Sequence, residues 1–270
     1  MRKIRVLVVE DSLVFRNLLV QGLNQDSALE VVATASDPFE ARDKIIEYRP
    51  DVMTLDIELP RMSGLEFLRK LMPQYPLPVV IISALSEKVF DAMKAGAVDF
   101  VAKPQVTERE QLRNFLCSEL PVKIKVASTA RVSRYKKPVA FAADQHLSVR
   151  SDIDIIAIGA STGGTEAIAE VIRDFSTDIP GTVIVQHMPP GFTEMYANRL
   201  DSQSRVKVKE AKNGDMVAPG QVLIAPGGSE HMSIVKVGDN YKVVLKKGEK
   251  VNGHCPSVDV LFNSVADVAG

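Results

Sequence analysis

Ser161 stands in the sequence Gly159-Ala160-Ser161-Thr162-Gly163, where an apolar run gives way to a helical pattern. This spacing matches the G-x-S-x-G turn, which lifts a serine hydroxyl above the end of a strand. A glycine-rich turn between a strand and a helix can also bind phosphate. However, the sequence contains neither a G-x-G-x-x-G motif nor the lysine of a P-loop. The pattern therefore favours a nucleophilic serine over a phosphate site.

A nucleophilic serine needs a base, and His187 is the best-placed histidine. It follows the next apolar run, in "TVIVQHMPPGFT", so parallel strands would bring it to the same sheet edge as Ser161. There it could accept the hydroxyl proton and return it to a leaving alcohol. The alternative is a partly buried capping histidine. Among the other histidines, His231 is a lesser candidate that would line the cleft, His254 would be structural, and His146 falls in a basic middle segment.

A second group of reactive side chains follows apolar runs in the first part of the chain. The group comprises Glu10, Asp11, Asp56, Ser83 and Lys103. Carboxylates gathered at one sheet edge would repel one another unless a hard cation such as Mg²⁺ bound their oxygens. A carboxylate beside Mg²⁺ and an ammonium group is suited to attack a phosphoryl group. The alternative, that each acid merely caps the next helix, does not account for the whole set together with Lys103-Pro104.

The elements that must position these residues alternate between strands and helices. Residues 1–120 contain five apolar runs, each followed by a helical pattern, which predicts a parallel sheet covered on both faces. The predicted strands are 4–9, 31–35, 52–57, 78–83 and 99–102. The second part begins in the same way and then changes. Its predicted elements are strands 153–158 and 182–186, helices 164–175 and 192–200, the run 221–226, a hairpin turning at 238–240 and a closing helix over 257–270.

Composition is that of a folded protein without a dominant charge. Of 270 residues, 46% are hydrophobic and 25% charged, and the formal net charge is −1, which gives no global attraction to nucleic acid or membranes. No apolar run is long enough to span a membrane, and the start reads as a strand rather than a signal peptide. The two cysteines, Cys117 and Cys255, are expected to be buried thiols of a cytoplasmic protein.

The segment 121–150 differs from both of its neighbours. It holds seven basic residues against one acidic residue and shows no convincing period, so we interpret it as a basic linker. The predicted domains are therefore 1–120, the linker 121–150, and 151–270.

The motifs "VVEDS", "DVMTLDIELPRMSGLEFL", "VVIISA" and "GAVDFVAKP" resemble the receiver domain of two-component response regulators. The resemblance implies a (βα)5 fold in which Asp56 accepts phosphate from a sensor histidine kinase in the presence of Mg²⁺. It further implies that Glu10 and Asp11 hold the metal with Asp56, and that Glu58 offers a backbone carbonyl. The expected phosphate-binding and switch residues are Ser83, Lys103 and Phe100.

The motifs "IGASTGGTEAI", "VIVQHMPPGFT", "IAPGGSEHM" and "PSVDVLFNSVA" resemble the catalytic domain of chemotaxis protein-glutamate methylesterases. The resemblance implies a doubly wound, Rossmann-like parallel sheet, with Ser161 as nucleophile, His187 as base and then acid, and Thr162 as an oxyanion-hole candidate. The implied reaction is hydrolysis of methyl esters on chemoreceptor helices, with deamidation of receptor glutamines, and no cofactor for the esterase step. A monomer without nucleic-acid or membrane binding is expected, and the receiver would cover the cleft until Asp56 is phosphorylated.

One part of the family pattern is missing. The family's third catalytic member is an aspartate in a Gly-Met-Gly-x-Asp-Gly segment, which this sequence lacks, and neither Asp259 nor Asp267 matches it. The sequence therefore predicts a chain truncated in its catalytic domain and nearly inactive, because loss of a triad acid costs on the order of 10⁴-fold in serine proteases. Two alternatives stay open: a non-catalytic receiver protein that competes for kinase phosphate, and a DNA-binding regulator, which the strands and acidic charge of 151–270 disfavour.

Overall fold

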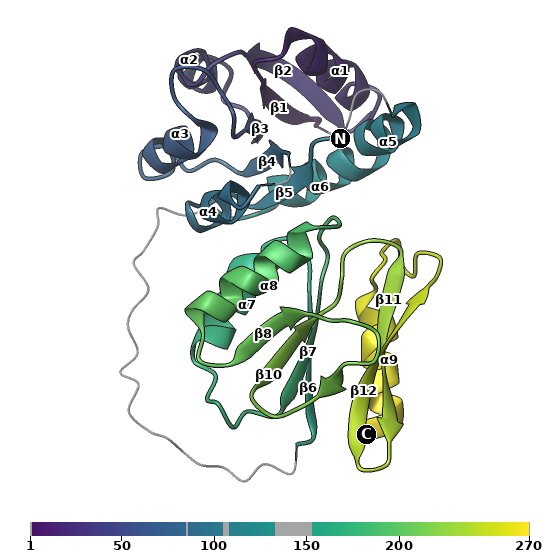
Figure 1. The fold of residues 1–270 in the computed structure, drawn as a ribbon. Coiled ribbons are helices and arrows are strands. Elements are labelled where there is room, and N and C mark those ends of the chain that lie inside the picture. The colour runs from purple at the N-terminus through teal and green to yellow at the C-terminus, as the bar shows by residue number, and fades with distance from the viewer. Residues whose placement is uncertain (1, 85, 105–107, 133–152, 270) are drawn as a thin grey trace. The chain divides into compact units, whose positions relative to one another are not determined.

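The computed structural model describes residues 2–84, 86–104, 108–132 and 153–269. The chain divides into two compact units, Met1–Lys137 and Pro138–Gly270 (Figure 1). Each unit has a sheet and a hydrophobic core of its own.

The first unit is a five-stranded parallel sheet in the order β2-β1-β3-β4-β5. Its elements are β1 Ile4–Val9, α1 Leu13–Leu23, β2 Leu29–Ala35, α2 Pro38–Tyr48, β3 Val52–Asp56, α3 Gly64–Leu71, β4 Val79–Ser83, α4 Lys88–Lys94, β5 Asp99–Ala102, α5 Arg109–Asn114, a π-helical turn Phe115–Glu119 and α6 Leu120–Ser128. The strand order reverses between β1 and β3, and the carboxyl ends of strands at such a reversal form a binding crevice. The predicted (βα)5 arrangement is confirmed.

Local side chains fix where several of these helices begin. The Asp37 carboxylate accepts hydrogen bonds from the backbone N–H groups of Phe39 and Glu40 at the start of α2. Ser63 does the same for the N–H of Glu66 at the start of α3. Such caps satisfy N–H groups that have no partner within the helix.

The end of the first unit differs from the prediction. The helical segment continues through α6 to Ser128, although the linker was predicted to begin at residue 121. Leu120, Ile124 and Ala127 have no exposed surface and belong to the core beneath the sheet. The basic residues of this stretch obscured an apolar stripe of helical spacing, so the predicted linker is wrong in its first residues. Residues 133–152, including His146, lie outside the described part of the chain.

The second unit combines a parallel and an antiparallel sheet. Its elements are β6 Ile155–Ala160, α7 Gly164–Arg173, β7 Gly181–Gln186, α8 Phe192–Gln203, β8 Lys207–Glu210, β9 Met216–Val217, β10 Gln221–Ile224, β11 Glu230–Val237, β12 Asn240–Lys247 and α9 Val258–Ala269. The parallel sheet has the order β6-β7-β10-β8, and the antiparallel sheet has the order β11-β12-β9.

Different elements cover the two faces of the parallel sheet. Helix α7 contacts β6 and α8 contacts β8, whereas α9 contacts β6, β7 and β11. Val183, Val185 and Leu223 pack with Met232 of the hairpin and Leu261 of α9 in one core. The α/β class with parallel sheets in two domains is confirmed, as is the hairpin, whose turn consists of Gly238 and Asp239.

Two strands of this unit were not predicted. β8 has the sequence KVKE, whose charged residues leave no run of alternating apolar residues to indicate a strand. β9 has two residues. In β8, Lys207 and Lys209 extend to Asp201 and Asp215, at 2.7 and 2.8 Å. Charged side chains such as these lysines are common on edge strands, because they oppose pairing with another chain.

Two smaller observations complete the fold. Cys117 is exposed and Cys255 is half-buried, so the prediction of two buried thiols is wrong. Within the described residues, none of the helices combines the length and the apolar character that crossing a membrane requires.

Candidate functional site

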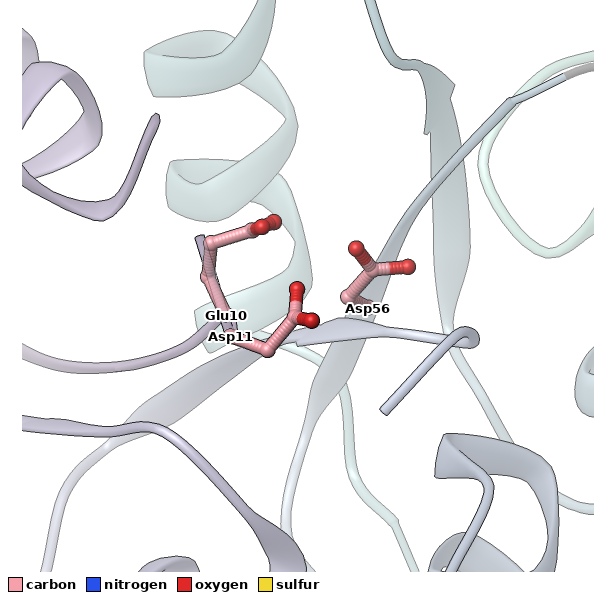
Figure 2. A group of neighbouring side chains, drawn as sticks. All are labelled: Glu10, Asp11 and Asp56. Carbon is pink, nitrogen blue, oxygen red and sulfur yellow. The ribbon is translucent and has the colours of Figure 1, made fainter. Parts of the chain in front are cut away.

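The acidic residues of the first unit converge at the carboxyl ends of its strands. Glu10 directly follows β1, and Asp56 is the last residue of β3. Oxygen atoms of Glu10, Asp11 and Asp56 all lie within 4.8 Å of one another, and Figure 2 shows the three side chains facing a common space. The parallel pairing of β1 with β3 produces this arrangement, because it places the ends of both strands at one edge.

Lys103, which follows β5, neutralises part of this cluster. Its Nζ donates to both carboxylate oxygens of Glu10, at 3.0 and 2.8 Å, and to Oδ2 of Asp56, at 2.7 Å. The ammonium group also lies 4.8 Å from the ring centroid of Phe15, a cation–π distance. Burial by itself would lower the pKa of Lys103, but its bonds to Asp56 and Glu10 outweigh burial and raise that pKa.

Glu10 is almost fully buried, and this affects its protonation. Burial raises the pKa of Glu10 from 4.5 to about 7, the bond from Lys103 opposes the shift, and the charge on Asp56 adds to it. Burial and the negative charge of Asp56 therefore make this carboxyl group easier to protonate than an exposed glutamate. A positive ion beside it would favour the charged form.

The chemistry of the cluster fits a hard divalent cation. Three carboxylates supply oxygen ligands, and Asp11 is exposed, so a hydrated ion could reach the cluster from solvent. Lys103 alone cannot balance three carboxylate charges. The cluster therefore suits Mg²⁺, which keeps several of its own waters when bound by carboxylates.

The other predicted residues of this site lie on neighbouring strands. Ser83 is buried at the end of β4, and its carbonyl accepts the backbone N–H of Lys103 at 2.7 Å. Phe100 in β5 is buried against Phe90, with ring centroids 6.2 Å apart. The side chain of Glu58 is exposed, and its backbone N–H donates to Oδ1 of Asp56 at 3.0 Å. All the predicted residues thus lie on one rim or on the strands beside it.

In the second unit, the structure brings Ser161 and His187 together. Ser161 is exposed in the turn between β6 and α7, and His187 directly follows β7. Ala160 pairs with Gln186 across these parallel strands, and the N–H of His187 donates to the carbonyl of Ala160 at 3.2 Å. As a result, Nδ1 of His187 lies 3.2 Å from Oγ of Ser161. The structure thus brings together the two residues that the sequence predicts as nucleophile and base.

Two glycines of the motif meet specific backbone and packing demands. Gly163 has φ +78°, in the left-handed region that side chains disfavour. A Cβ on Gly159 would lie 2.3 Å from Cγ1 of Val258 in α9, so this position allows the helix to approach the strand. Gly163 therefore serves the turn that presents Ser161, whereas Gly159 serves the packing of α9 on β6. Thr162 lies half-buried within the turn.

His254 is a member of this site that sequence reasoning missed. Its ring stacks on the ring of His187, with centroids 3.8 Å apart and planes 11° apart. The residue lies in the loop between β12 and α9, and it had been predicted to be structural. No local pattern could have indicated the contact, because the loop reaches His187 only through the packing of α9 beside β6.

His231 does not line the cleft, contrary to the prediction. It is 7% exposed, its Nε2 lies 2.8 Å from the carbonyl of Glu249, and the N–H of Ser257 donates to its Nδ1 at 3.1 Å. These contacts assign the ring hydrogen to Nε2. His231 therefore links β11 to both ends of the loop that carries His254.

Comparison with known proteins agrees with this geometry. Residues 6–116 match the family model described as "Response regulator receiver domain", and residues 156–270 match "CheB methylesterase". The class defined by fold and site is thus a response regulator with a methylesterase output domain.

Relatives make the assignment more specific. A protein-glutamate methylesterase/protein-glutamine glutaminase 2 of Syntrophomonas wolfei is 59% identical across the whole chain, which covers 78% of that relative. The corresponding protein of Syntrophotalea carbinolica is 51% identical with the same coverage. A crystal structure of the response regulator domain of Thermotoga maritima CheB is 37% identical, covering 48% of this chain and 99% of that chain, with a TM-score of 0.45. The chain belongs to the protein-glutamate methylesterase/protein-glutamine glutaminase family.

Proposed function

We propose that this protein hydrolyses methyl esters of glutamate side chains on chemoreceptor helices and deamidates glutamine side chains there, at a low rate because the sequence lacks the Gly-Met-Gly-x-Asp-Gly segment. Phosphorylation of Asp56 activates the hydrolysis. The observation that carries the proposal is the 3.2 Å contact between Oγ of Ser161 and Nδ1 of His187, at adjacent strand ends of a chain in this family.

The geometry supports a two-stage hydrolysis. In the first stage, Oγ of Ser161 attacks the ester carbonyl carbon while Nδ1 of His187 accepts its proton. The tetrahedral intermediate then collapses, the proton passes from His187 to the leaving oxygen, and methanol departs. In the second stage, water attacks the acyl-serine with His187 again as base, which releases the glutamate carboxylate and restores Ser161. With a glutamine substrate the leaving group is ammonia.

Thr162 is the proposed source of an oxyanion-hole amide. It follows the nucleophile in the turn that leads into α7, and the residue after the nucleophile supplies such an amide in G-x-S-x-G enzymes. Backbone N–H groups aimed at a developing oxyanion stabilise it strongly in a site that excludes water. The esterase step needs no cofactor.

We propose Asp56 as the phosphoacceptor of the receiver domain. Receiver domains use a divalent metal for phosphorylation. A carboxylate oxygen of Asp56 would attack the phosphorus of a phosphohistidine on a sensor kinase, and the bond from phosphorus to the histidine nitrogen would break. Glu10, Asp11 and Asp56 would hold Mg²⁺, which when bound offsets charge on the transferring group. Lys103 would then pair with the phosphate, Ser83 would bond to it, and Phe100 would respond by a rotamer change.

The proposed partners follow from this activity. They are a chemotaxis sensor histidine kinase as phosphodonor and the cytoplasmic helices of methyl-accepting chemoreceptors as substrate, encountered by a monomer in the cytoplasm. The protein is not expected to bind nucleic acid or to insert into a membrane.

The experiment that tests the proposal measures methanol release from methylated receptor, with and without a small-molecule phosphodonor. Ser161→Ala should abolish release under both conditions. Asp56→Asn should leave basal release unchanged and remove its stimulation. Undiminished release by Ser161→Ala would refute the assignment of the nucleophile. If neither the protein nor its variants release methanol while Asp56 still accepts phosphate, the non-catalytic, phosphate-competing alternative would be correct.

A further inference from the structure

Gln186 occupies an unusual position beneath the candidate active site. It is the last residue of β7, directly before His187, and only 3% of its surface is exposed. Alternation along the strand turns its side chain toward the start of α7, beneath the turn that carries Ser161. Buried polar groups are normally paired within the protein. The amide nitrogen of Gln186 is paired, whereas its Oε1 has no hydrogen-bond partner among the described residues.

The amide of Gln186 contacts the backbone of both reactive residues. Its Nε2 donates to the carbonyl of Ser161 at 2.9 Å and to the carbonyl of His187 at 3.3 Å. The pairing of β6 with β7 ends at Ala160 and Gln186, so regular strand pairing does not extend to these two carbonyls. One side chain therefore joins the two segments just beyond the point where the sheet stops joining them.

Gly164 provides the space that this side chain needs. A Cβ at Gly164 would lie 2.0 Å from Oε1 of Gln186 and 2.6 Å from Cβ of Ala160. Gly164 is the first residue of α7, where a glycine is otherwise a poor helix former. Position 164 thus requires glycine because the side chain of Gln186 approaches it closely, whereas position 163 requires glycine because its φ is positive.

We propose that Gln186 is a positioning residue for the hydrolysis, because its amide holds the backbone of Ser161 and His187 at the separation their side-chain contact requires. The inference rests on the proposed function of that pair. Small displacements of reacting groups lower rates steeply, and a shift of 1 Å can cost about 100-fold. Gln186 itself is buried beneath the turn and does not touch the substrate.

The alternative is that Gln186 only fills space under the turn, and two quantities separate these roles. A side chain that only supports folding changes the fraction of molecules that are folded and able to react. A positioning residue changes the rate constant of each competent molecule. A fluorophosphonate probe measures both, because it labels an activated serine and needs no receptor.

The test compares labelling of Gln186→Leu with that of the unchanged protein. Leucine has a similar volume but cannot donate a hydrogen bond. We expect the labelling rate constant to fall about 10- to 100-fold, with complete labelling at long times. In methanol release, kcat should fall with little change in KM. Gln186→Asn, which keeps the amide but shortens its reach, should also slow labelling and serves if the leucine variant does not fold.

Thr182→Val is the matched control. Thr182 is fully buried near the other end of β7, and its Oγ1 donates to the carbonyl of Pro180 at 3.0 Å. This variant also loses one buried hydrogen bond, but it should label within twofold of the unchanged rate constant. Ser161→Ala tests the underlying function separately, because it should not label at all.

The outcomes separate the two hypotheses. If Ser161→Ala is not labelled but a folded Gln186 variant keeps the unchanged rate constant, the positioning role is refuted and the proposed function stands. A reduced labelled fraction with an unchanged rate constant also refutes it, in favour of a packing role. Labelling of Ser161→Ala at the rate of the unchanged protein would instead refute the function of the pair, and this inference with it.

Discussion

At the scale of single residues, both candidate sites place reactive groups at the ends of parallel strands and hold them with a partner from the end of another strand of the same sheet. Lys103 bridges Glu10 and Asp56 in the first unit, and His187 contacts Ser161 in the second. The sheets supply the geometry in both cases, because adjacent parallel strands end at the same edge.

His254 leads to the first residue-scale prediction. Its ring covers one face of His187, and stacked aromatic rings contribute about 1 kcal/mol beyond area burial. His254→Ala should therefore lower kcat/KM for methyl-ester hydrolysis by roughly fivefold, because the imidazole of His187 gains rotational freedom.

His254→Phe is the control, since it keeps a flat ring and removes the titratable group. It should retain most of the activity. If the phenylalanine variant loses as much activity as the alanine variant, stacking is not the role of His254.

At the scale of elements, α6 belongs to the first unit and is not a linker. The prediction is that Ile124→Ala lowers the free energy of unfolding by about 2–4 kcal/mol, because it leaves a cavity beneath the sheet. Val122 on the same helix is 54% exposed, so Val122→Ala should change stability by less than about 0.5 kcal/mol. Urea unfolding measures both. Equal, small effects would mean that this stretch is a linker after all.

An ion pair also ties α6 to the loop after α1. Nζ of Lys125 lies 2.7 Å from Oδ2 of Asp26, and this bond, with the N–H of Ala28, lowers the pKa of Asp26 below 3.8. The resulting stabilisation is fully present above the unfolded-state pKa and is lost as pH falls through the lower folded-state pKa. Because both side chains are partly exposed, it amounts to less than about 1 kcal/mol.

Asp26→Asn tests this pH dependence. The variant should be less stable than the unchanged protein at pH 7, and the difference should shrink progressively as pH falls below 3.8. Denaturant unfolding across this pH range provides the measurement. A difference that stays constant with pH would show that charge on Asp26 does not stabilise the helix.

At the scale of the whole molecule, the two units have separate sheets and separate cores. We therefore predict two unfolding transitions in calorimetry. Mg²⁺ should raise the transition temperature of the first unit and leave that of the second unit unchanged. The reason is that a ligand stabilises the state that binds it, by about 2.7 kcal/mol at 100 times its Kd.

Asp11→Asn should reduce that shift, because it removes one of three carboxylates while leaving the contacts of Lys103 intact. A single transition that moves as a whole with Mg²⁺ would contradict the independence of the two units.

Much of the fold was predictable, because periodic apolar runs and capping residues act locally. The strand 99–102 coincides with its prediction. Prediction failed where charge masked the period, as in β8 and in α6. It also failed for Cys117, which is exposed.

The sequence by itself determined the alternation of strands and helices, and thereby which residues follow strands. That placed Asp56, Ser161 and His187 at sheet edges, since parallel strands point in one direction. Only the tertiary structure decided which other residues contact this pair: His254 stacks on His187, and the amide of Gln186 lies beneath Ser161 and His187. Those contacts depend on side-chain direction and on the packing of distant loops, and neither has a period that can be read along a chain.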